Sequence, residues 1–566
     1  GETDQIIDAA LRAEYGEAGR GQAISDNTLR ALGLFCRLRR DFKVSAEDFA
    51  ALLQGVALYA RGGEQPQFDR VFNDPSLFSE PLVLEDSAFS IVPGSDAEYR
   101  KILHLCGALG IGFDTYLYVA RYIAQAGSDQ QRVRDGEGET LLWSHAVISA
   151  FYRFTRLAAW IGLTSIEVIA LLQLMGRRGH HYVARLVTPA LAVYQHSDLS
   201  DTLSVVQGLT DAVHWCREQE VTVDWLYQRL MPLATLATAG ERDRELLGQI
   251  HVRMLPTIIT SVVFIEAGVP MIAGADRPTA IDWFDLLKDF ISTDGLVHDI
   301  SDYETSEVFE TALTAKIKEI ISDLELPPES GVLVKVSSLV MDARAAQQSL
   351  VWESLANAFG GTSELSRELL AWAGGTCYAL LHEVLRIHSA VLPEQLPETG
   401  IEVMAEVLAL LARLAERAAI VEAFALSPLA VRSYLRHPQW FGVERAQHEA
   451  PVVEVDLRQL HALAQYRHLL EFARQPEPVM LDYLALVDSL PPDLSEADLQ
   501  MIREDAAGKV AAFTGFGIRD TLDTAREVTA EGIVSTVLQL DHLVRIRQAC
   551  ETLQLLSLIH ISEPTR

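Results

Sequence analysis

The sequence predicts an all-α protein built as an irregular stack of helix-turn-helix pairs, and three observations support this. Strand signals are sparse along the 566 residues. Apolar residues recur every three or four positions, as at Leu32, Phe35, Leu38 and Phe42, which is the period of an amphipathic helix. Between such runs, an apolar residue followed by Ser, Thr or Asp marks the start of the next helix.

The expected helix starts share one local chemistry. The hydroxyl or carboxylate accepts a hydrogen bond from an unpaired backbone N–H of the first turn, and the flanking apolar residues form a hydrophobic staple. These starts are Ser45, Thr164, Thr222, Ser427, Asp456 and Ser495. Side chains that can bond back to the cap from the third helical position are Asp48, Glu167, Gln459 and Asp498, although Asp is a short substitute for Glu. Pro428 occupies a first helical position, where proline is tolerated.

Breaks in the helical pattern divide the chain into blocks, and their unequal spacing argues against a tandem solenoid with one fixed period. Residues 75–96 are rich in Pro, Ser and Asp and are expected to cross the surface as an extended segment. Prolines in 323–330 and 391–400 interrupt helices and bracket a further block. The predicted organisation is a first helical block at 1–75, an extended connection at 76–97, a second helical block at 98–290, a helical insertion or lobe at 291–400, and a truncated third helical block at 401–556.

The composition limits the partners that this protein can have. With 78 acidic and 47 basic residues the net charge is −31, so the surface repels phosphate backbones and nucleic acid is not an expected partner. The 49% of hydrophobic residues supplies a core and argues against a disordered chain. The scattered cysteines, mostly on apolar helical stripes, are expected to be buried free thiols; they are Cys36, Cys106, Cys216, Cys377 and Cys550.

The most apolar stretch and the two ends carry their own expectations. Residues 257–275 are interrupted by Glu266, Gly268 and Pro270, so the stretch falls short of the ~20 apolar residues of a membrane span and reads as a core helix followed by a turn. The chain begins at Gly1 without a signal-peptide pattern, so its first residues look like the middle of a reading frame. Residues 557–566 resemble a translated sequencing-adapter tail and are expected to be an artefact that takes no part in the fold.

Two histidine pairs could suggest a metal site, but neither has the spacing that a metal-binding pair needs. His382 and His388 lie six positions apart, whereas a zinc-protease helix needs histidines four apart on one face. His180 and His181 are adjacent in a turn, where neighbouring side chains diverge, so a solvated loop is expected. The sequence therefore predicts no metal site.

Thiol, glycine and aromatic motifs read as helix packing. Cys377 precedes His382 and could be imagined as a nucleophile with its base, but the surrounding pattern at 369–385 is helical and no strand leads into it. The glycines Gly107, Gly110 and Gly112 follow a helix where a phosphate-cradling loop would follow a strand. The pairs Trp283-Phe284 and Trp440-Phe441 are expected in the core and the acidic stretch 299–310 on a solvated face. No catalytic or cofactor-binding residue, no cofactor and no enzyme activity are predicted.

Three segments resemble the A component (TcA) of bacterial insecticidal toxin complexes. Residues 148–158, continued by Ile161-Gly162-Leu163-Thr164, look like a unit of its helical shell, and residues 34–53 look like another copy. The most specific match is Phe68-Asp69-Arg70-Val71-Phe72-Asn73-Asp74-Pro75. The resemblance is firm over residues 30–176 and continues in style to about residue 556. It implies a multi-lobed helical shell, of which this chain is a fragment.

The resemblance also carries expectations about the whole particle. It implies a secreted homopentamer whose shell surrounds a translocation channel and binds a receptor or glycan on target cells. The B and C toxin components, which enclose a toxic enzyme, would bind through regions outside this fragment, and the channel-forming helices would also lie outside it. A pH change opens the shell in that family; the 16 histidines here could contribute, although surface histidines with no switching role are the commoner case.

The predicted function is therefore a structural shell part of a pore-forming toxin translocation subunit that binds target cells and helps deliver a toxic enzyme. The alternative is a free-standing helical-repeat scaffold for protein–protein binding, which would need polar capping repeats near both termini. A helical hydrolase is the third possibility, and it requires a convergent set of polar groups that the sequence does not display.

Overall fold

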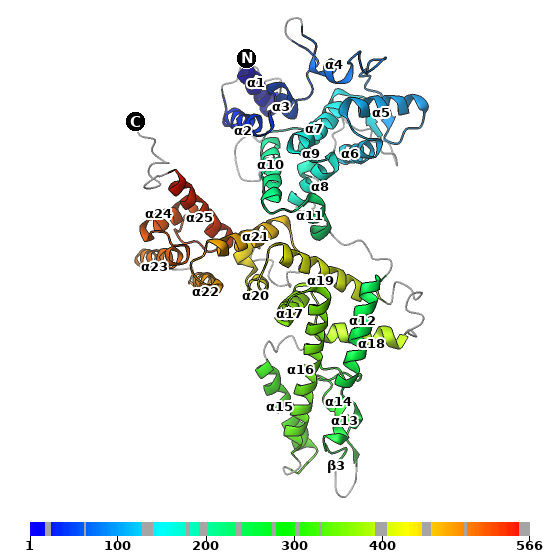
Figure 1. Cartoon of the computed structure of the whole chain (residues 1–566), viewed down its shortest axis with the longest axis vertical. Coiled ribbons are helices and arrows are strands. Elements are labelled where there is room, and N and C mark those ends of the chain that lie inside the picture. The colour runs from blue at the N-terminus through cyan, green and yellow to red at the C-terminus, as the bar shows by residue number, and fades with distance from the viewer. Residues whose placement is uncertain are drawn as a thin grey trace. The chain divides into compact units, whose positions relative to one another are not determined.

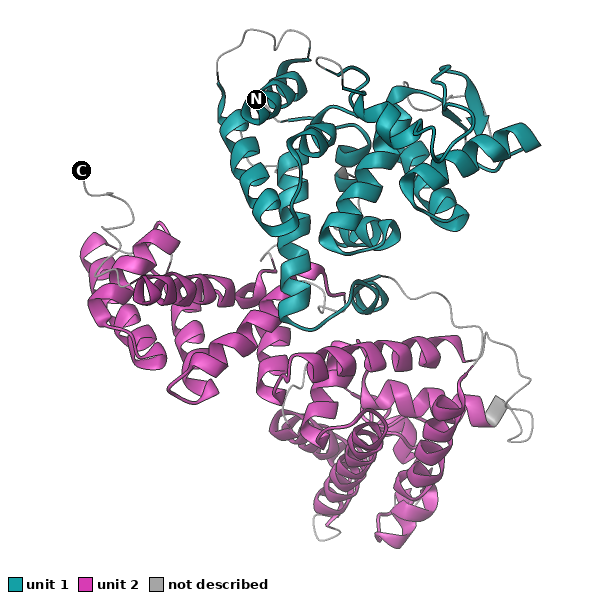
Figure 2. Ribbon diagram, turned by 45° about the horizontal axis from the view of Figure 1, so that its top comes forward, with its two compact units in different colours: residues 1–231 teal, residues 232–566 magenta. Residues whose placement is uncertain are grey.

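A computed structural model describes most of the chain. The described residues are 1–16, 24–60, 64–126, 140–176, 181–191, 201–231, 239–273, 279–299, 306–327, 331–390, 404–443, 454–491 and 495–553. They fold into two compact units, residues 1–231 (unit 1) and 232–566 (unit 2), shown in Figure 2. The five-block division expected from the sequence stays a prediction.

The described residues of unit 1 form helices and one short pair of strands, which are separated in the sequence by α5 and α6 (Figure 1). Strand β1 pairs antiparallel with β2, with Phe89 opposite Leu141. The elements of unit 1 are α1 (Glu2–Tyr15), α2 (Asp26–Phe42), α3 (Ala46–Leu53), α4 (Gln67–Phe72), β1 (Ala88–Ser90), α5 (Asp96–Leu109), α6 (Phe113–Ala126), β2 (Thr140–Leu142), α7 (His145–Ile161), α8 (Ser165–Met175), α9 (His181–Val187), α10 (Thr202–Glu218) and α11 (Val223–Leu230).

Helix α7 lies at the centre of unit 1, where it contacts α3, α5, α6, α8 and α9. Its residues are buried on nearly every face, including Phe151 and Phe154. The octamer singled out in the sequence supplies all but the first residue of α4. The helix packs here, since the Phe72 ring meets that of Tyr152 edge-on at 6.4 Å. The three segments that carry the family resemblance thus build one core.

A fully buried arginine joins three helices in that core. Arg153 of α7 is only 2% exposed. Its Nε donates to the Leu186 carbonyl at 2.6 Å and its Nη2 to that of Val187 at 2.8 Å, both at the end of α9. A longer bond of 3.5 Å runs from Nη1 to the Ala51 carbonyl in α3. Burial lowers the pKa of the Arg153 guanidinium to about 9, so it is a cation near neutral pH, stabilised by the carbonyl dipoles at the end of α9.

Unit 2 is also helical where the structure describes it, with one pair of two-residue strands among those residues. Helix α16 is its longest described element and contacts α12, α15, α17, α18 and α19. The elements are α12 (Glu241–Met254), η2 (Leu255–Thr257), α13 (Ser261–Glu266), β3 (Ile272–Ala273), β4 (Thr279–Ala280), α14 (Trp283–Leu286), α15 (Ser306–Asp323), α16 (Val332–Phe359), α17 (Ser363–Trp372), α18 (Cys377–Ala390), α19 (Ala405–Ala423), α20 (Pro428–Arg436), η5 (Pro438–Phe441), α21 (Leu457–Phe472), α22 (Glu477–Asp488), α23 (Glu496–Thr514), α24 (Ile518–Val528) and α25 (Val537–Thr552).

One part of unit 2 has a hydrophobic core of its own. We call residues 256–346 the α16 lobe; it holds η2, α13, α14, α15 and the first half of α16. Trp283, Phe290 and Phe309 are buried together there with Val336 and Val340 of α16. The lobe is therefore a packed body, and its surface features are held by a fixed interior.

The all-α prediction is confirmed, and so are the six predicted helix starts. In each, the Ser, Thr or Asp side chain accepts the expected bond from the third helical N–H, and Pro428 occupies a first helical position. The return bond forms at Glu167 and Gln459. At Asp498 the short carboxylate accepts from the Ser495 hydroxyl instead, while that of Asp48 accepts from the Tyr152 hydroxyl at 2.6 Å.

Other expectations meet mixed outcomes. Residues 75–87 and 91–95 lie outside helices around β1, and α15 ends before Pro327, as the breaks predicted. The prolines of 391–400 and the tail at 557–566 lie outside the described residues. Four cysteines are buried free thiols, but Cys36 is exposed, so this prediction was wrong there. Cys36 follows Phe35 on α2, and the apolar face of that helix turns Leu34, Phe35 and Leu38 inward instead.

Candidate functional site

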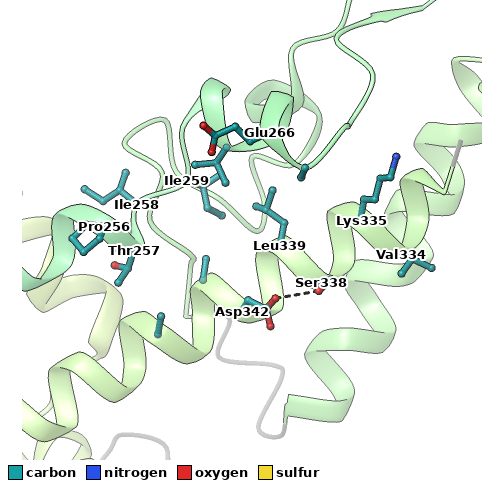
Figure 3. Close-up of a pocket in the computed structure, with 14 residues that line it drawn as sticks. Pro256, Thr257, Ile258, Ile259, Glu266, Val334, Lys335, Ser338, Leu339 and Asp342 are labelled. Carbon is teal, nitrogen blue, oxygen red and sulfur yellow. Dashed lines mark hydrogen bonds between the residues drawn. The ribbon is translucent and has the colours of Figure 1, made fainter.

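An apolar groove runs along α16 on the surface of the α16 lobe (Figure 3). Its volume is about 670 Å³. One wall is the α16 stripe Val334, Lys335, Ser338, Leu339, Asp342, Ala343 and Ala346; the other is Pro256, Thr257, Ile258, Ile259, Val263, Glu266 and Ala267. The α16 residues recur every three or four positions, so they form one face of the helix that spans about 18 Å.

A buried glutamine fixes the second wall against α16. Gln347 is 3% exposed and its Nε2 donates to the carbonyls of Thr257 at 3.0 Å and Gly295 at 3.3 Å. Its Oε1 accepts from the Val297 N–H at 2.9 Å. With its amide groups bonded on both sides, Gln347 holds the wall segment and the 291–297 turn in one arrangement.

A close backbone approach at Gly295 completes this arrangement. The Ile259 N–H donates to the Gly295 carbonyl at 3.0 Å. Gly295 has φ +77°, and a Cβ there would lie 2.0 Å from the Ile259 oxygen. Only glycine fits this position, because it accepts the positive φ and leaves room for the neighbouring chain. The groove is thus formed before any partner binds.

Aliphatic side chains stand exposed around the groove. Val334 is 72% exposed, Ile265 59% and Val262 58%. By length and composition alone, the stretch Glu241–Glu266 is long and apolar enough to cross a membrane, and 28% of its most apolar 18-residue segment is buried. If the bent helix pairs α5–α6 and α7–α8 are each counted as one span, the number of candidate spans rises to three. The described part of the apolar stretch 257–275 holds the end of η2, α13, a turn and β3. Phe264 is buried as expected, but several neighbours face outward.

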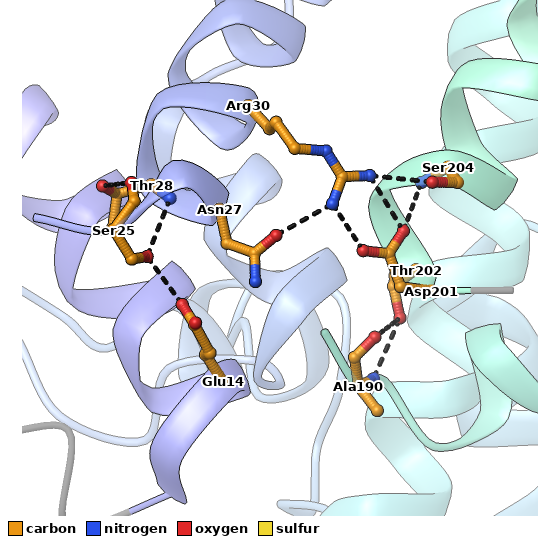
Figure 4. Close-up of polar contacts among 9 residues, drawn as sticks. All are labelled: Glu14, Ser25, Asn27, Thr28, Arg30, Ala190, Asp201, Thr202 and Ser204. Carbon is orange, nitrogen blue, oxygen red and sulfur yellow. Dashed lines mark hydrogen bonds and ion pairs between the residues drawn. The ribbon is translucent and has the colours of Figure 1, made fainter. Parts of the chain in front are cut away.

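A polar network joins α2 to the start of α10 in unit 1 (Figure 4). Arg30 pairs with Asp201 through both carboxylate oxygens, at 2.8 and 3.2 Å, and donates to the Ser204 hydroxyl at 2.8 Å. Asp201 also caps α10, since its Oδ1 accepts from the Ser204 N–H at 2.8 Å. Burial raises the pKa of the Asp201 carboxyl, but the bonds from Arg30 and Ser204 outweigh it and hold the pKa below its usual value.

Replacing Asp201 by alanine is expected to lower the stability of unit 1 by about 2 kcal/mol, from a lost helix cap and a lost two-point ion pair. Because the folded pKa is depressed, this contribution is present above pH ~4 and is lost as the pH falls below it. Hydrogen exchange of the α2 and α10 amides in the intact chain measures it. The matched control is Asp211→Ala, on the same helix, where a carboxylate 52% exposed pairs with Arg37; less than about 0.5 kcal/mol is expected there. Equal losses in both variants would contradict this account.

Two histidine rings stack between α12 and α18 in unit 2. The centroids of His251 and His388 lie 3.9 Å apart with their planes at 5°, and His388 Nδ1 lies 2.9 Å from the Val384 carbonyl oxygen. Burial, with the positive charge that His388 acquires on protonation, lowers the pKa of His251. The contact therefore favours the neutral form of His251.

Acid is expected to weaken this contact. As the pH falls below about 6.5, the unfolded chain binds the His251 proton before the folded chain does, so stability is complete above that pH and declines below it. A His251→Gln variant should show a smaller loss of thermal stability between pH 7.5 and 5.5 than the unchanged chain. The exposed His542 provides the control variant His542→Gln, for which no change in this loss is expected. An unaltered acid response in His251→Gln would refute the assignment.

The histidines considered for a metal do not converge in the structure. His382 lies 3.9 Å from the carboxylate of its neighbour Glu383, which is itself paired with Arg386, while His388 faces His251. His180 lies outside the described residues, and His181 begins α9. Across the described parts of the chain, no group of three or more His, Cys, Asp or Glu side chains is placed to hold a metal ion.

The remaining motifs are Cys377, the glycines at the end of α5, two aromatic pairs and the acidic stretch. Burial raises the pKa of the Cys377 thiol well above its usual value, so it is not a thiolate nucleophile at neutral pH. Gly110 ends α5 in the left-handed conformation with φ 68°. Trp283, Trp440 and Phe441 are buried, and Phe284 packs against the lobe core. Of the acidic stretch 299–310, the structure describes residue 299 and residues 306–310.

Sequence reasoning missed the groove entirely. Its residues come from two segments about 80 positions apart, and neither has a motif. The sequence held two separate signals: the apolar stretch 257–275, and a later helical pattern with Val334, Leu339 and Ala343 on one stripe. These signals indicate two apolar surfaces that can pack together. They do not show that a groove remains between them.

Comparison with solved structures shows that the fold of this chain is that of helical Tc toxin subunits. The chain aligns with Morganella morganii TcdA4 at a TM-score of 0.53 and 13% identity, over 95% of this chain and 18% of that one. It aligns with Yersinia pseudotuberculosis TcaA-TcaB at a TM-score of 0.52 and 13% identity, over 97% of this chain and 24% of the other. At such identities these likenesses show the fold.

The chain also resembles one curated toxin subunit in sequence. The chain is 24% identical over 393 residues to toxin subunit YenA1 of Yersinia entomophaga, which covers 68% of this chain and 31% of the relative. No protein-family model matches the chain. The resemblance drawn from the sequence is confirmed: the chain is like the A component of bacterial toxin complexes and spans less than a third of the length of this relative.

Proposed function

We propose that this chain is a structural part of the helical shell of a secreted toxin-complex A subunit, a subunit that binds target cells and helps deliver a toxic enzyme. The observation that carries the proposal is the 24% identity to toxin subunit YenA1, sustained over 393 residues. The likeness of fold to two Tc toxin structures over at least 95% of the chain supports it.

The internal construction of the described residues supports a structural role. The described cores are closed by buried hydrogen-bonded groups such as Arg153 and Gln347, which give rigidity. The considered nucleophile, Cys377, is buried in a helix and protonated. On this proposal the chain is not an enzyme; the oligomer is a homopentamer, and the B and C components bind elsewhere on the subunit.

The test is to recover the reading frame around this chain, express its whole product, and measure mass by light scattering and shape by electron microscopy. An epitope inserted at the exposed Gly360-Gly361 turn between α16 and α17 locates the chain in the particle. A ring-shaped homo-oligomer with the epitope on its periphery is the expected result. A monomeric product of about this length would overturn the proposal and favour the free-standing helical scaffold.

A further inference from the structure

The groove on the α16 lobe has no role in the function proposed above, and its occupant can be inferred from its chemistry. Its walls are mainly aliphatic, with Ile258 and Val263 on one side and Val334 and Leu339 on the other. An exposed apolar surface of this kind, on a lobe with its own packed core, is typical of a binding site for another apolar surface.

The backbone of the groove indicates whether the partner is a helix or an extended strand. The α16 wall is continuous helix, so its N–H and C=O groups are bonded within the helix and offer no strand edge to an extended peptide. A partner that brings its own satisfied backbone is required, and an amphipathic helix lying along the α16 stripe meets that need. The stripe length of about 18 Å accommodates three to four helical turns.

The charge of the groove decides the polar face of the partner. Glu266 stands on one wall and Asp342 on the other, both exposed (Figure 3). Of the residues that line the groove, Lys335 is the basic one, and its ammonium donates to the Gly268 carbonyl at 2.9 Å. Across residues 256–346 the sequence has 16 acidic and six basic side chains. A partner helix with lysine or arginine beside its aliphatic stripe complements this surface.

We propose that the groove between α13 and α16 binds a basic amphipathic helix of a protein partner. Aliphatic side chains of that helix lie between Ile258 and Val334, and its cationic side chains reach Glu266 and Asp342. A lipid surface is the competing occupant because of the exposed aliphatic residues. It is disfavoured because the site is concave and the lobe has a net negative charge, which repels anionic lipid headgroups.

The probe is a fluorescein-labelled 18-residue peptide with leucine at helical spacing and lysine elsewhere, against a version with glutamate for lysine. Fluorescence anisotropy with the full chain should show binding of the lysine peptide at least tenfold tighter than of the glutamate peptide. Glu266→Lys combined with Asp342→Lys should weaken the lysine peptide at least tenfold. The control pair Glu307→Lys and Glu310→Lys, exposed on α15 and away from the groove, has the same change of net charge and should leave binding within about twofold.

A second pair of variants separates groove contact from general attraction by charge. Val334→Ser should weaken the lysine peptide about fivefold, whereas Met501→Ser, at a residue 65% exposed on α23, should have no effect. Equal effects of groove and control variants would overturn the proposal, as would binding to phosphatidylcholine vesicles that Val334→Ser abolishes while the peptide does not bind. Circular dichroism of each variant confirms folding. Failure of this test leaves the shell assignment untouched, because that assignment rests on the identity to YenA1 and is tested separately by oligomer mass and shape.

Discussion

Replacing Arg153 by methionine is expected to lower the stability of unit 1 by about 3 kcal/mol. Methionine is apolar and of similar length, so the cavity is largely filled and the loss comes from the polar contacts. The two short bonds to Leu186 and Val187 are donated by a cation to carbonyls, and such bonds are stronger than neutral ones. Their loss frees the end of α9 from α7.

The consequence should be local to unit 1. Hydrogen exchange of the intact chain, followed by mass spectrometry, should show faster exchange in α7 and α9 with unit 2 unchanged. Arg153→Lys keeps the charge but cannot make the forked contact, so an intermediate loss is expected. Arg156→Met, on the same helix at an exposed position, is the control and should cost less than about 0.5 kcal/mol. If Arg153→Met proved as mild as that control, the guanidinium would not be what joins these helices.

Replacing Gly295 by alanine is expected to destabilise the α16 lobe by more than about 3 kcal/mol. Two costs add: a positive φ of +77° for a residue with a Cβ, and a Cβ placed 2.0 Å from the Ile259 oxygen. The neighbouring chain must move, which breaks the bond from the Ile259 N–H to the Gly295 carbonyl. Since Ile259 lines the groove, its second wall should loosen as well.

Two other glycines separate these costs. Gly331 has φ +61° and no atom nearer than 3.8 Å to its would-be Cβ, so Gly331→Ala measures the backbone cost alone, about 1 kcal/mol. Gly248, inside α12, has nothing within 4 Å, and Gly248→Ala should stabilise the helix by up to about 1 kcal/mol. Thermal unfolding, with hydrogen exchange of the lobe for Gly295→Ala and Gly331→Ala and of α12 for Gly248→Ala, ranks the three variants. A loss at Gly295 no larger than at Gly331 would show that the close approach is relieved at little cost.

Local features of this protein could be predicted from the sequence because their causes lie within one helical turn. The cap at Thr164 and its return bond from Glu167 join residues three apart. Such contacts form wherever the helix forms, whatever surrounds it. The same holds for the apolar stripes that identified α2 and α7, because helical periodicity alone puts those residues on one face.

Where a distant residue competes for the same group, the local prediction fails. The Asp48 carboxylate was expected to bond back to Ser45, but it accepts from Tyr152, 104 positions away. Cys36 was expected to be buried, but its place on α2 faces outward. The sequence pattern shows at which helical positions such residues recur. It does not show which distant residue will pack against them.

By itself, the sequence determined the all-α class, the helix starts and the likeness to toxin A components, since these depend on short-range hydrogen bonds and on patterns within single segments. Only the tertiary structure decided which buried polar groups join helices and where the surface stays open. Arg153 contacts carbonyls 33, 34 and 102 positions away, and the groove lies between two segments whose relative position is fixed by contacts of Gln347 and Gly295. Such contacts depend on how preformed helices pack, and packing follows from the shapes of all of them together.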